Sequence, residues 1–155
     1  MKRFELGAST INGQGLIATT RIAKGTFIGF IKGPVIFKVI MSPEDSLCGP
    51  DWIGFRKNHW IDTLPPFKYI NHSCAPNCGI MGSRKVHAIR DIALGEELTL
   101  DYAITEIDLN WFLDCTCKSE NCRGVVRSIQ SLPYATISAY LPYIPTHFQK
   151  YAAKG

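Results

Sequence analysis

Hydrophobic residues along this chain fall into short runs separated by turn residues, and amphipathic helical patterns are scarce. Residues 26–31 and 35–40 are rich in β-branched and aromatic side chains, with Gly33 and Pro34 between them. Residues 60–63, 86–89 and 97–102 continue the pattern of short strands. The pattern therefore predicts a mainly β fold that begins near residue 4.

Three stretches depart from this strand pattern. Residues 42–46 contain capping residues for a short helix, which Gly49 and Pro50 would end. Residues 69–78 carry Asn, His and two Cys around Pro76, so we expect a loop or a single turn there. The aromatic tail after residue 128 ends in a helical spacing at 148, 151 and 152, which predicts a final amphipathic turn packed on the domain.

One pattern occurs twice, seventy positions apart. Ala, Ile, Ala, Gly and an aliphatic residue at positions 18, 22, 23, 25 and 28 recur at 88, 92, 93, 95 and 98. Each copy predicts a strand, a tight turn at Ala-x-Gly and a second strand, as in a hairpin. Two copies are too few for a solenoid.

The length of 155 residues indicates one globular domain, or one domain with a short appendix, and the apolar content of 46% is ordinary. The net charge of +4 comes from scattered Lys and Arg, so direct nucleic-acid binding is not expected. No signal peptide or bilayer-spanning run is visible, which predicts an intracellular protein without a membrane partner. The oligomeric state is not encoded in any motif, and a monomer is the default expectation.

Six cysteines in such a chain suggest thiols and metal in preference to disulfides. Cys115, Cys117 and Cys122 form a C-x-C-x4-C cluster, whose thiolates suit tetrahedral zinc but leave one position open. Cys74 or Cys78 can fill that position. The alternative is that reduced cysteines serve as small hydrophobic residues. Cys48 is expected to be a buried free thiol.

Four motifs in order carry a family resemblance: G-x-G at 13–15, N-H-S-C-x-P-N at 71–77, G-E-E-L-T-x-D-Y at 95–102 and C-x-C-x4-C-R-G at 115–124. Together they resemble a SET-domain protein-lysine methyltransferase of the small stand-alone type, with a post-SET zinc-binding segment. The likeness covers about residues 5–127.

The resemblance implies a SET fold: several small β-sheets around a pseudoknot where the 71–78 loop crosses residues 101–102. It implies a SET domain at 1–112 with an insert at about 42–60, a post-SET zinc segment at 113–127, and an aromatic tail at 128–155. It also implies S-adenosyl-L-methionine as methyl donor and a protein lysine as acceptor.

Residue roles follow from the same resemblance. The residues expected to bind the donor are Gly13, Gln14, Gly15, Leu16, Tyr69, Asn71, His72 and Tyr102. Tyr102 is also the expected catalytic residue, it shares the lysine channel with Leu100, and Cys74 is the expected fourth zinc ligand. From the residues alone, Asn71 and His72 can equally be buried polar side chains that close loop backbone groups. Tyr102 can likewise be an ordinary core aromatic residue, and Glu97 receives no catalytic role.

Two departures from the family pattern bear on activity. Residues 30–34 read Phe-Ile-Lys-Gly-Pro where the family usually has E-Y-x-G-E, so a second active-site tyrosine is missing. The alternative function is therefore a catalytically weak module that binds the donor or a peptide. Leu100 stands where the family usually has Phe or Tyr, so we expect tolerance of di- or trimethylation. Acidic residues at 44, 45 and 51 can attract a histone tail or another basic protein, or simply form a solvated loop.

Overall fold

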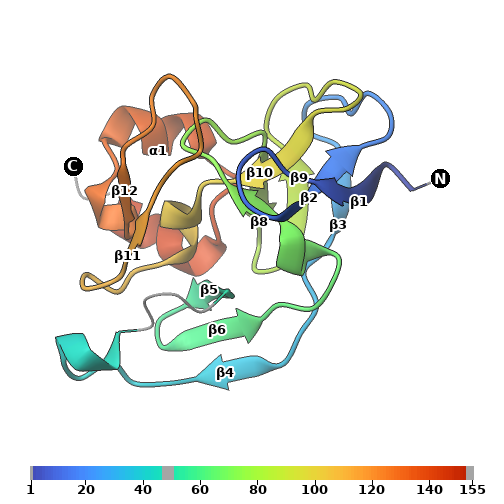
Figure 1. Cartoon of the computed structure of the whole chain (residues 1–155). Helices are drawn as coiled ribbons and strands as arrows, with labels where there is room; N and C mark the ends of the chain where they lie inside the picture. The colour runs from blue at the N-terminus through green and yellow to red at the C-terminus, as the bar shows by residue number, and fades with distance from the viewer. Residues whose placement is uncertain (1, 47–50, 153–155) are drawn as a thin grey trace.

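The computed structural model describes residues 2–46 and 51–152, so Cys48 lies outside the described residues. Most of its regular structure is short strands (Figure 1), which confirms the mainly β expectation. The strands are β1 (Phe4–Ala8), β2 (Gln14–Ala18), β3 (Phe27–Phe30), β4 (Val35–Phe37), β5 (Trp52–Arg56), β6 (His59–Asp62), β7 (Asn71–His72), β8 (Cys78–Met81), β9 (Lys85–Ala88), β10 (Glu97–Leu100), β11 (Phe112–Asp114) and β12 (Val125–Arg127).

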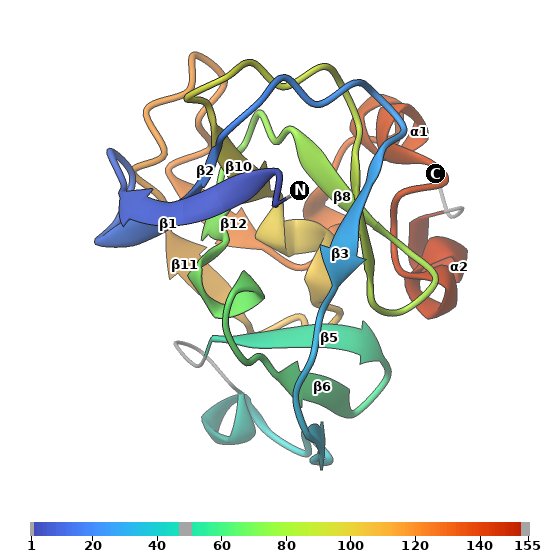
Figure 2. The same cartoon turned by 90° about the vertical axis from the view of Figure 1, so that its right-hand side faces the viewer.

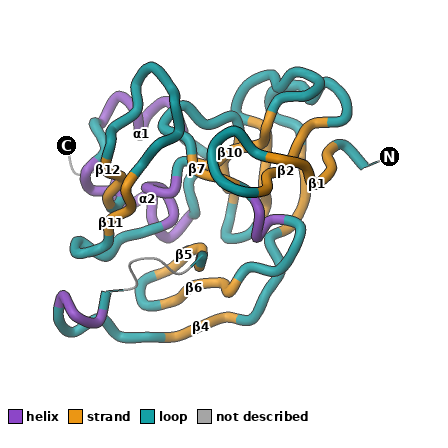
Figure 3. Tube along the Cα trace, in the orientation of Figure 1, coloured by secondary structure: helices purple, strands orange, loops and turns teal. Residues whose placement is uncertain are grey.

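Four small sheets result from these strands. One has the order β1-β2-β10-β7, and two three-stranded sheets have the orders β3-β9-β8 and β4-β6-β5. A two-stranded sheet, β11-β12, flanks the cysteine segment. The β4-β6-β5 sheet lies apart from the others at the bottom of the molecule, as the tube view and the rotated view both show (Figure 2, Figure 3). Strand β5 and the start of β6 fall within the predicted insert at about 42–60, whereas β4 precedes it.

Helices are few and short. They are the 3-10 turns η1 (Pro43–Asp45), η2 (Phe67–Tyr69), η3 (Tyr102–Thr105), η4 (Ile129–Ser131) and η5 (Thr146–Phe148), and the α-helices α1 (Tyr134–Tyr140) and α2 (Gln149–Ala152). The predicted short helix after Ser42 is present as η1, and the final turn as η5 and α2. Helix α1 was not anticipated. Within residues 2–46 and 51–152, every helix is too short or too polar to cross a membrane.

The two copies of the Ala-x-Gly pattern pair with each other, so the hairpin expectation is wrong. Strand β2 pairs with β1 and β10, whereas β3 pairs with β9. The two turns meet through an antiparallel bridge between Ile22 and Ile92. Gly25 and Gly95 adopt φ of 84° and 82°, which a side chain rarely tolerates. The repeat therefore builds one pseudo-symmetric crossing of β2–β3 with β9–β10.

The Asn-His segment is a two-residue strand, where the sequence suggested only a loop. Strand β7 lies parallel to β10, with Asn71 opposite Thr99 and His72 opposite Leu100. The Ser73 N–H continues this pairing by donating to the Leu100 carbonyl at 2.9 Å. This crossing brings residues 71–73 against residues 100–102, as the resemblance predicted.

The buried side chains of the described residues form two hydrophobic cores. The first contains the buried side chains of β2, β8, β9 and β10, among them Leu16, Ile80 and Leu98. The second combines Ala103 and Ile104 of η3 with Val126 of the cysteine segment and Phe148 of the tail. The tail thus packs on the domain, as expected. Tyr102 contacts both cores.

Candidate active site

Tyr102 is held at both ends, at the point where β10 passes into η3. Its backbone N–H donates to Nδ1 of His72 at 3.0 Å, and its hydroxyl donates to the Ile70 carbonyl at 2.6 Å. The two rings stand edge to face with centroids 5.4 Å apart. Burial, and then the negative charges of Asp51 and Glu97, raise the pKa of Tyr102, so the phenol stays protonated at neutral pH.

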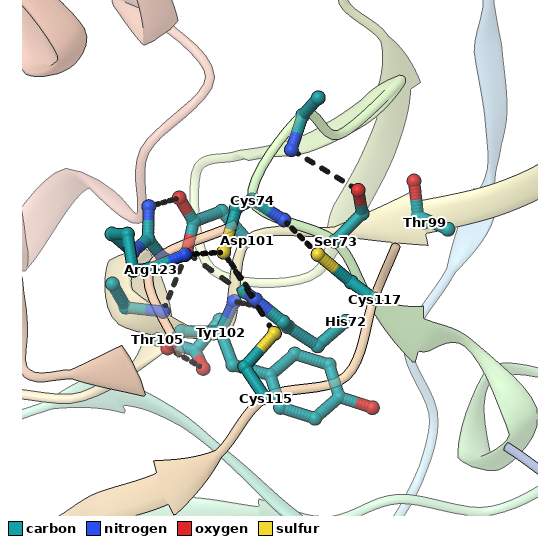
Figure 4. A network of polar contacts seen from close by, with 12 residues as sticks. His72, Ser73, Cys74, Thr99, Asp101, Tyr102, Thr105, Cys115, Cys117 and Arg123 are labelled. Carbon is teal, nitrogen blue, oxygen red and sulfur yellow. Dashed lines mark hydrogen bonds and ion pairs between the residues drawn. The ribbon is translucent and has the colours of Figure 1, made fainter. Parts of the chain in front are cut away.

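His72 connects Tyr102 to the cysteine cluster (Figure 4). Because a backbone N–H can only donate, Nδ1 of His72 must be the unprotonated nitrogen. The proton therefore sits on Nε2, which lies 3.3 Å from the Cys74 Sγ. Burial lowers the His72 pKa to about 4 despite the nearby Asp101, so this imidazole is neutral at physiological pH.

Asn71 ties the G-x-G loop to the strand pair. Its Nδ2 lies 2.7 Å from a Glu97 carboxylate oxygen, and 3.1, 3.1 and 2.9 Å from Ser9 Oγ and the carbonyls of Asn12 and Gln14. Ser9 Oγ in turn contacts both Glu97 oxygens. Asn71 thus closes loop backbone groups, the second role that the sequence left open. Donor binding by Asn71 stays a prediction.

A cavity of about 450 Å³ opens beside these residues. Its walls come from the G-x-G loop, β7, Tyr102 and the cysteine segment: Ile11, Asn12, Gly13, Gln14, Asp51, Lys68, Tyr69, Asn71, His72, Tyr102, Leu113, Asp114, Cys115, Thr116 and Cys117. Six of the eight predicted donor-binding residues line it. Leu16 is fully buried in the first core, and a Cβ at Gly15 would overlap the Glu97 carboxylate. Neither of these two residues lines the cavity.

A second cavity, of about 30 Å³, lies between the β4-β6-β5 sheet and η3. Its lining is largely apolar and aromatic: Asp51, Trp52, Ile53, Thr63, Phe67, Lys68, Ile70, Tyr102, Thr105, Glu106 and Trp111. Asp51, Lys68 and Tyr102 line both cavities. Leu100, the other residue predicted for the lysine channel, is fully buried and lines neither cavity.

Sequence reasoning missed most of the wall of this narrow cavity. Glu106 is only 4% exposed, and its carboxylate accepts from Trp60 Nε1 and from the N–H groups of Ile107 and Asp108, each at 2.8 Å. Burial nevertheless raises the Glu106 pKa, outweighing these hydrogen bonds. Trp52 lines the cavity, whereas Trp60 is buried beneath it and binds Glu106.

The cysteine cluster has dimensions suited to a tetrahedral metal. His72, Cys74, Cys115 and Cys117 offer ligand atoms that all lie within 4.8 Å of one another. The Cys115 Sγ is 3.8 Å from the Cys74 Sγ and 3.7 Å from the Cys122 Sγ. Four sulfurs at a zinc–sulfur distance of about 2.3 Å would lie about 3.8 Å apart. The cluster can therefore hold a zinc ion.

The thiol environments differ within and outside this cluster. Burial opposes ionisation of Cys117, but hydrogen bonds from the Cys74 N–H and from Ser119 outweigh it and lower the pKa to about 6. Cys78 instead belongs to the first core, where burial raises its pKa to about 12. The geometry thus places Cys74, and not Cys78, beside the C-x-C-x4-C segment.

Comparison with known families agrees with this geometry. The model of the SET domain matches residues 13–103, more than half of the chain. The chain therefore belongs to the SET domain family. This match includes the G-x-G loop, the Asn-His strand and Tyr102, and it ends before the cysteine segment.

Similar proteins include several histone methyltransferases. The chain is 32% identical over 139 residues to the H3 lysine-4 specific histone-lysine N-methyltransferase of Schizosaccharomyces pombe, covering 79% of this chain and 15% of that protein. It is 35% identical over 133 residues to human histone-lysine N-methyltransferase 2D, covering 76% of this chain and 2% of that protein. It is 34% identical over 83 residues to methyltransferase flvH of Aspergillus flavus, covering 52% and 47%. The chain thus spans less than half the length of these relatives.

Solved structures show the same fold. The methyltransferase domain of human histone-lysine N-methyltransferase SETMAR superposes with a TM-score of 0.61 at 18% identity, covering 83% of this chain and 59% of that chain. KRYPTONITE, in complex with mCHG DNA and SAH, superposes with a TM-score of 0.60 at 23% identity, covering 79% and 28%. These likenesses establish the SET fold.

Proposed function

We propose that this protein is an S-adenosyl-L-methionine-dependent protein-lysine N-methyltransferase. The observation that carries the proposal is the meeting of a wide and a narrow cavity at Tyr102. Methyl transfer to an amine needs a donor and an acceptor that enter from different sides and meet in line. The residues shared by both cavities mark that meeting point.

The wide cavity is the proposed donor site. Its volume is in the range of small-molecule pockets, and the G-x-G backbone and β7 form one wall. Gly13, Gln14, Tyr69, Asn71 and His72 are the proposed contacts. Gly15 and Leu16 would act by packing and backbone placement behind that wall. The bound donor would supply an electrophilic methyl group on a sulfonium.

The narrow cavity is the proposed lysine channel. A free lysine has a pKa of about 10.4, so the amine needs an environment that disfavours its charge. Apolar walls such as Phe67 and Trp111 desolvate it and lower its pKa. Because the Tyr102 hydroxyl donates its hydrogen bond to the Ile70 carbonyl, its oxygen keeps lone pairs that can accept an amine N–H and orient the nitrogen.

The proposed metal site is structural zinc held by Cys74, Cys115, Cys117 and Cys122. His72, and not Cys122, completes the group of four ligand atoms that lie within 4.8 Å of one another, and Cys122 contacts Cys115. The His72 Nδ1, however, accepts from Tyr102, so its Nε2 carries the proton and has no lone pair for a metal. His72 then donates to the Cys74 sulfur. Since Cys115 and Cys117 also line the wide cavity, this zinc site would shape the donor pocket.

The proposed substrate is a lysine in a protein, with a histone tail or another basic protein as the leading class. The similarity to histone-lysine methyltransferases supports this choice, as do the acidic residues at 44, 45 and 51. In the β4-β6-β5 order β5 is an edge strand, and its Trp52 and Ile53 line the narrow cavity. An extended peptide can add there as a further strand.

Further details of this proposal follow from the sequence. We propose a monomer with a SET domain at 1–112, a post-SET segment at 113–127 and a tail at 128–155, acting inside the cell or on chromatin. Leu100 lies in the first core, against which Tyr102 packs, and not in the wall of the narrow cavity. From that position behind Tyr102, we propose, the absence of a hydroxyl at Leu100 permits di- or trimethylation.

The alternative is a catalytically weak module that binds donor or peptide. Its support is the position of the missing tyrosine, where Ile31 is 1% exposed in the first core and lines neither cavity. Such a module would keep the donor site and lack efficient transfer.

A labelled-methyl assay on a histone panel and a cell extract tests the proposal, with S-adenosylhomocysteine calorimetry in parallel. We expect transfer to lysine by the wild type and a loss of about 100-fold in Tyr102→Phe, the size typical of a lost orienting group. Tyr134→Phe, a 65% exposed tyrosine of α1, is the matched control. Binding without transfer would favour the alternative module, and absence of binding would end both.

A further inference from the structure

Asp101, the residue before Tyr102, is a completely buried carboxylate. It accepts two hydrogen bonds from the guanidinium of Arg123, at 2.8 and 2.6 Å, and one from the Tyr140 hydroxyl at 2.9 Å. It also accepts the Ala103 N–H at 3.0 Å and so caps η3. One buried charge therefore connects the end of β10 with two segments that lie further along the chain, at Arg123 and at Tyr140.

The energetics make these contacts interdependent. Burying an isolated carboxylate costs several kcal/mol, which paired charges and hydrogen bonds must offset. Burial opposes the charge on Arg123, but its hydrogen bonds and attraction to Asp101 keep the guanidinium pKa raised. Burial, and then the Asp101 charge, raise the pKa of Tyr140, so its hydroxyl remains a donor. Loss of either partner leaves Asp101 under-satisfied.

The partners come from the two segments outside the family match. Arg123 follows Cys122 directly, and its backbone N–H lies 3.4 Å from the Cys74 Sγ. Tyr140 is the last residue of α1, in the tail. Neither residue lines either cavity, and the side chains of both meet at Asp101, the residue before Tyr102.

We propose that Tyr140 of the tail and Arg123 of the cysteine segment are positioning residues that fix Tyr102 through buried Asp101. The tail then helps to set the geometry of the active site, in addition to packing in the second core. Asp101 sets the start of η3, and the adjacent Tyr102 is aimed between the two cavities by that turn. This inference rests on the proposed methyltransferase function.

The test compares Tyr140→Phe with the control Tyr134→Phe in the full chain. Tyr140→Phe keeps the buried ring and deletes the hydroxyl that contacts Asp101. We expect kcat to fall about 10-fold, as for one lost hydrogen bond to a charged group. The dissociation constant for S-adenosylhomocysteine should change less than about 2-fold, because the donor-cavity wall is untouched. Arg123→Lys keeps the positive charge but loses the bidentate contact to Asp101, so we expect the same fall in kcat and the same small change in the dissociation constant.

A spectroscopic measurement reads the positioning without activity. With ¹³Cζ-labelled tyrosine, the Tyr102 resonance, identified by its absence in Tyr102→Phe, should shift or broaden in Tyr140→Phe and stay unchanged in Tyr134→Phe. Unchanged kcat and an unchanged Tyr102 resonance in Tyr140→Phe would overturn the inference. If the wild type transfers no methyl group, the proposed function fails, whereas the resonance still decides whether Tyr140 positions Tyr102.

Discussion

Asn71 offers a sharp test of how the donor loop is built. Its amide nitrogen is surrounded by four acceptors, the closest being a Glu97 carboxylate oxygen at 2.7 Å. Asn71→Asp keeps the size of the side chain but replaces this donor with an acceptor. The substitution therefore places a second carboxylate beside that of Glu97, which should destabilise the fold in a pH-dependent way.

The size of the loss in folding stability depends on whether the two carboxylates stay charged or one of them takes up a proton. At 2.7 Å and an effective dielectric of about 20, two carboxylates repel by about 6 kcal/mol. Protonating one of them costs less free energy than this repulsion, because protonating an acid with a pKa of about 3.9 at pH 7 costs about 4 kcal/mol. The penalty should therefore be about 4 kcal/mol at pH 7. It should fall to about 1.5 kcal/mol at pH 5, since a raised folded-state pKa makes stability increase as pH falls.

Urea unfolding of wild type and variants at pH 7 and pH 5 measures these penalties. Asn71→Ala is the uncharged control, which loses the same hydrogen bonds but should show no comparable pH dependence. Adding Glu97→Gln to Asn71→Asp exchanges donor and acceptor and should recover at least 1 kcal/mol. Equal penalties at both pH values, or no recovery in the double variant, would refute this account of the loop.

Three further predictions concern metal, pH and product. Elemental analysis should find one zinc per chain, lost in Cys115→Ser and retained in Cys78→Ser; retention in both would remove the proposed ligand set. The kcat/KM should rise with pH toward about 10 as the substrate amine loses its proton, because the raised Tyr102 pKa keeps the phenol neutral. A falling limb in that range, absent in Tyr102→Phe, would contradict this assignment. Mass spectrometry should detect di- or trimethyllysine with the wild type and mainly monomethyllysine with Leu100→Tyr, whereas a monomethyl product alone from the wild type would argue against the role given to Leu100.

Much of this fold could be predicted from the sequence, because local residue patterns determine short strands and turns. Turn residues and β-branched runs marked most strands, and the spacing of Cys115, Cys117 and Cys122 anticipated the cluster. The pairing of the repeat was not predictable in this way. The turns at Gly25 and Gly95 read locally as hairpin turns, but each strand pairs with the other copy, and such long-range pairing leaves no local signal.

Site residues that stand in a recognisable sequence motif could be predicted, whereas residues that gain a role only through burial in the fold could not. Tyr102 and Asn71 stand in motifs, whereas Glu106 and Tyr140 are ordinary residues until the fold buries them beside a cavity or a charge. Asp101 precedes Tyr102 and Arg123 follows Cys122, so both were visible in the motifs. Their pairing follows only from the packing of the cysteine segment on the strand end.

The most direct test of the central claim is a crystal structure of the protein with S-adenosylhomocysteine and a lysine peptide. The account predicts the donor product in the wide cavity against residues 13–14 and 71–72, with the lysine side chain in the narrow cavity and the Tyr102 hydroxyl between them. A ligand bound elsewhere, or a wall of side chains separating the two cavities at Tyr102, would contradict it.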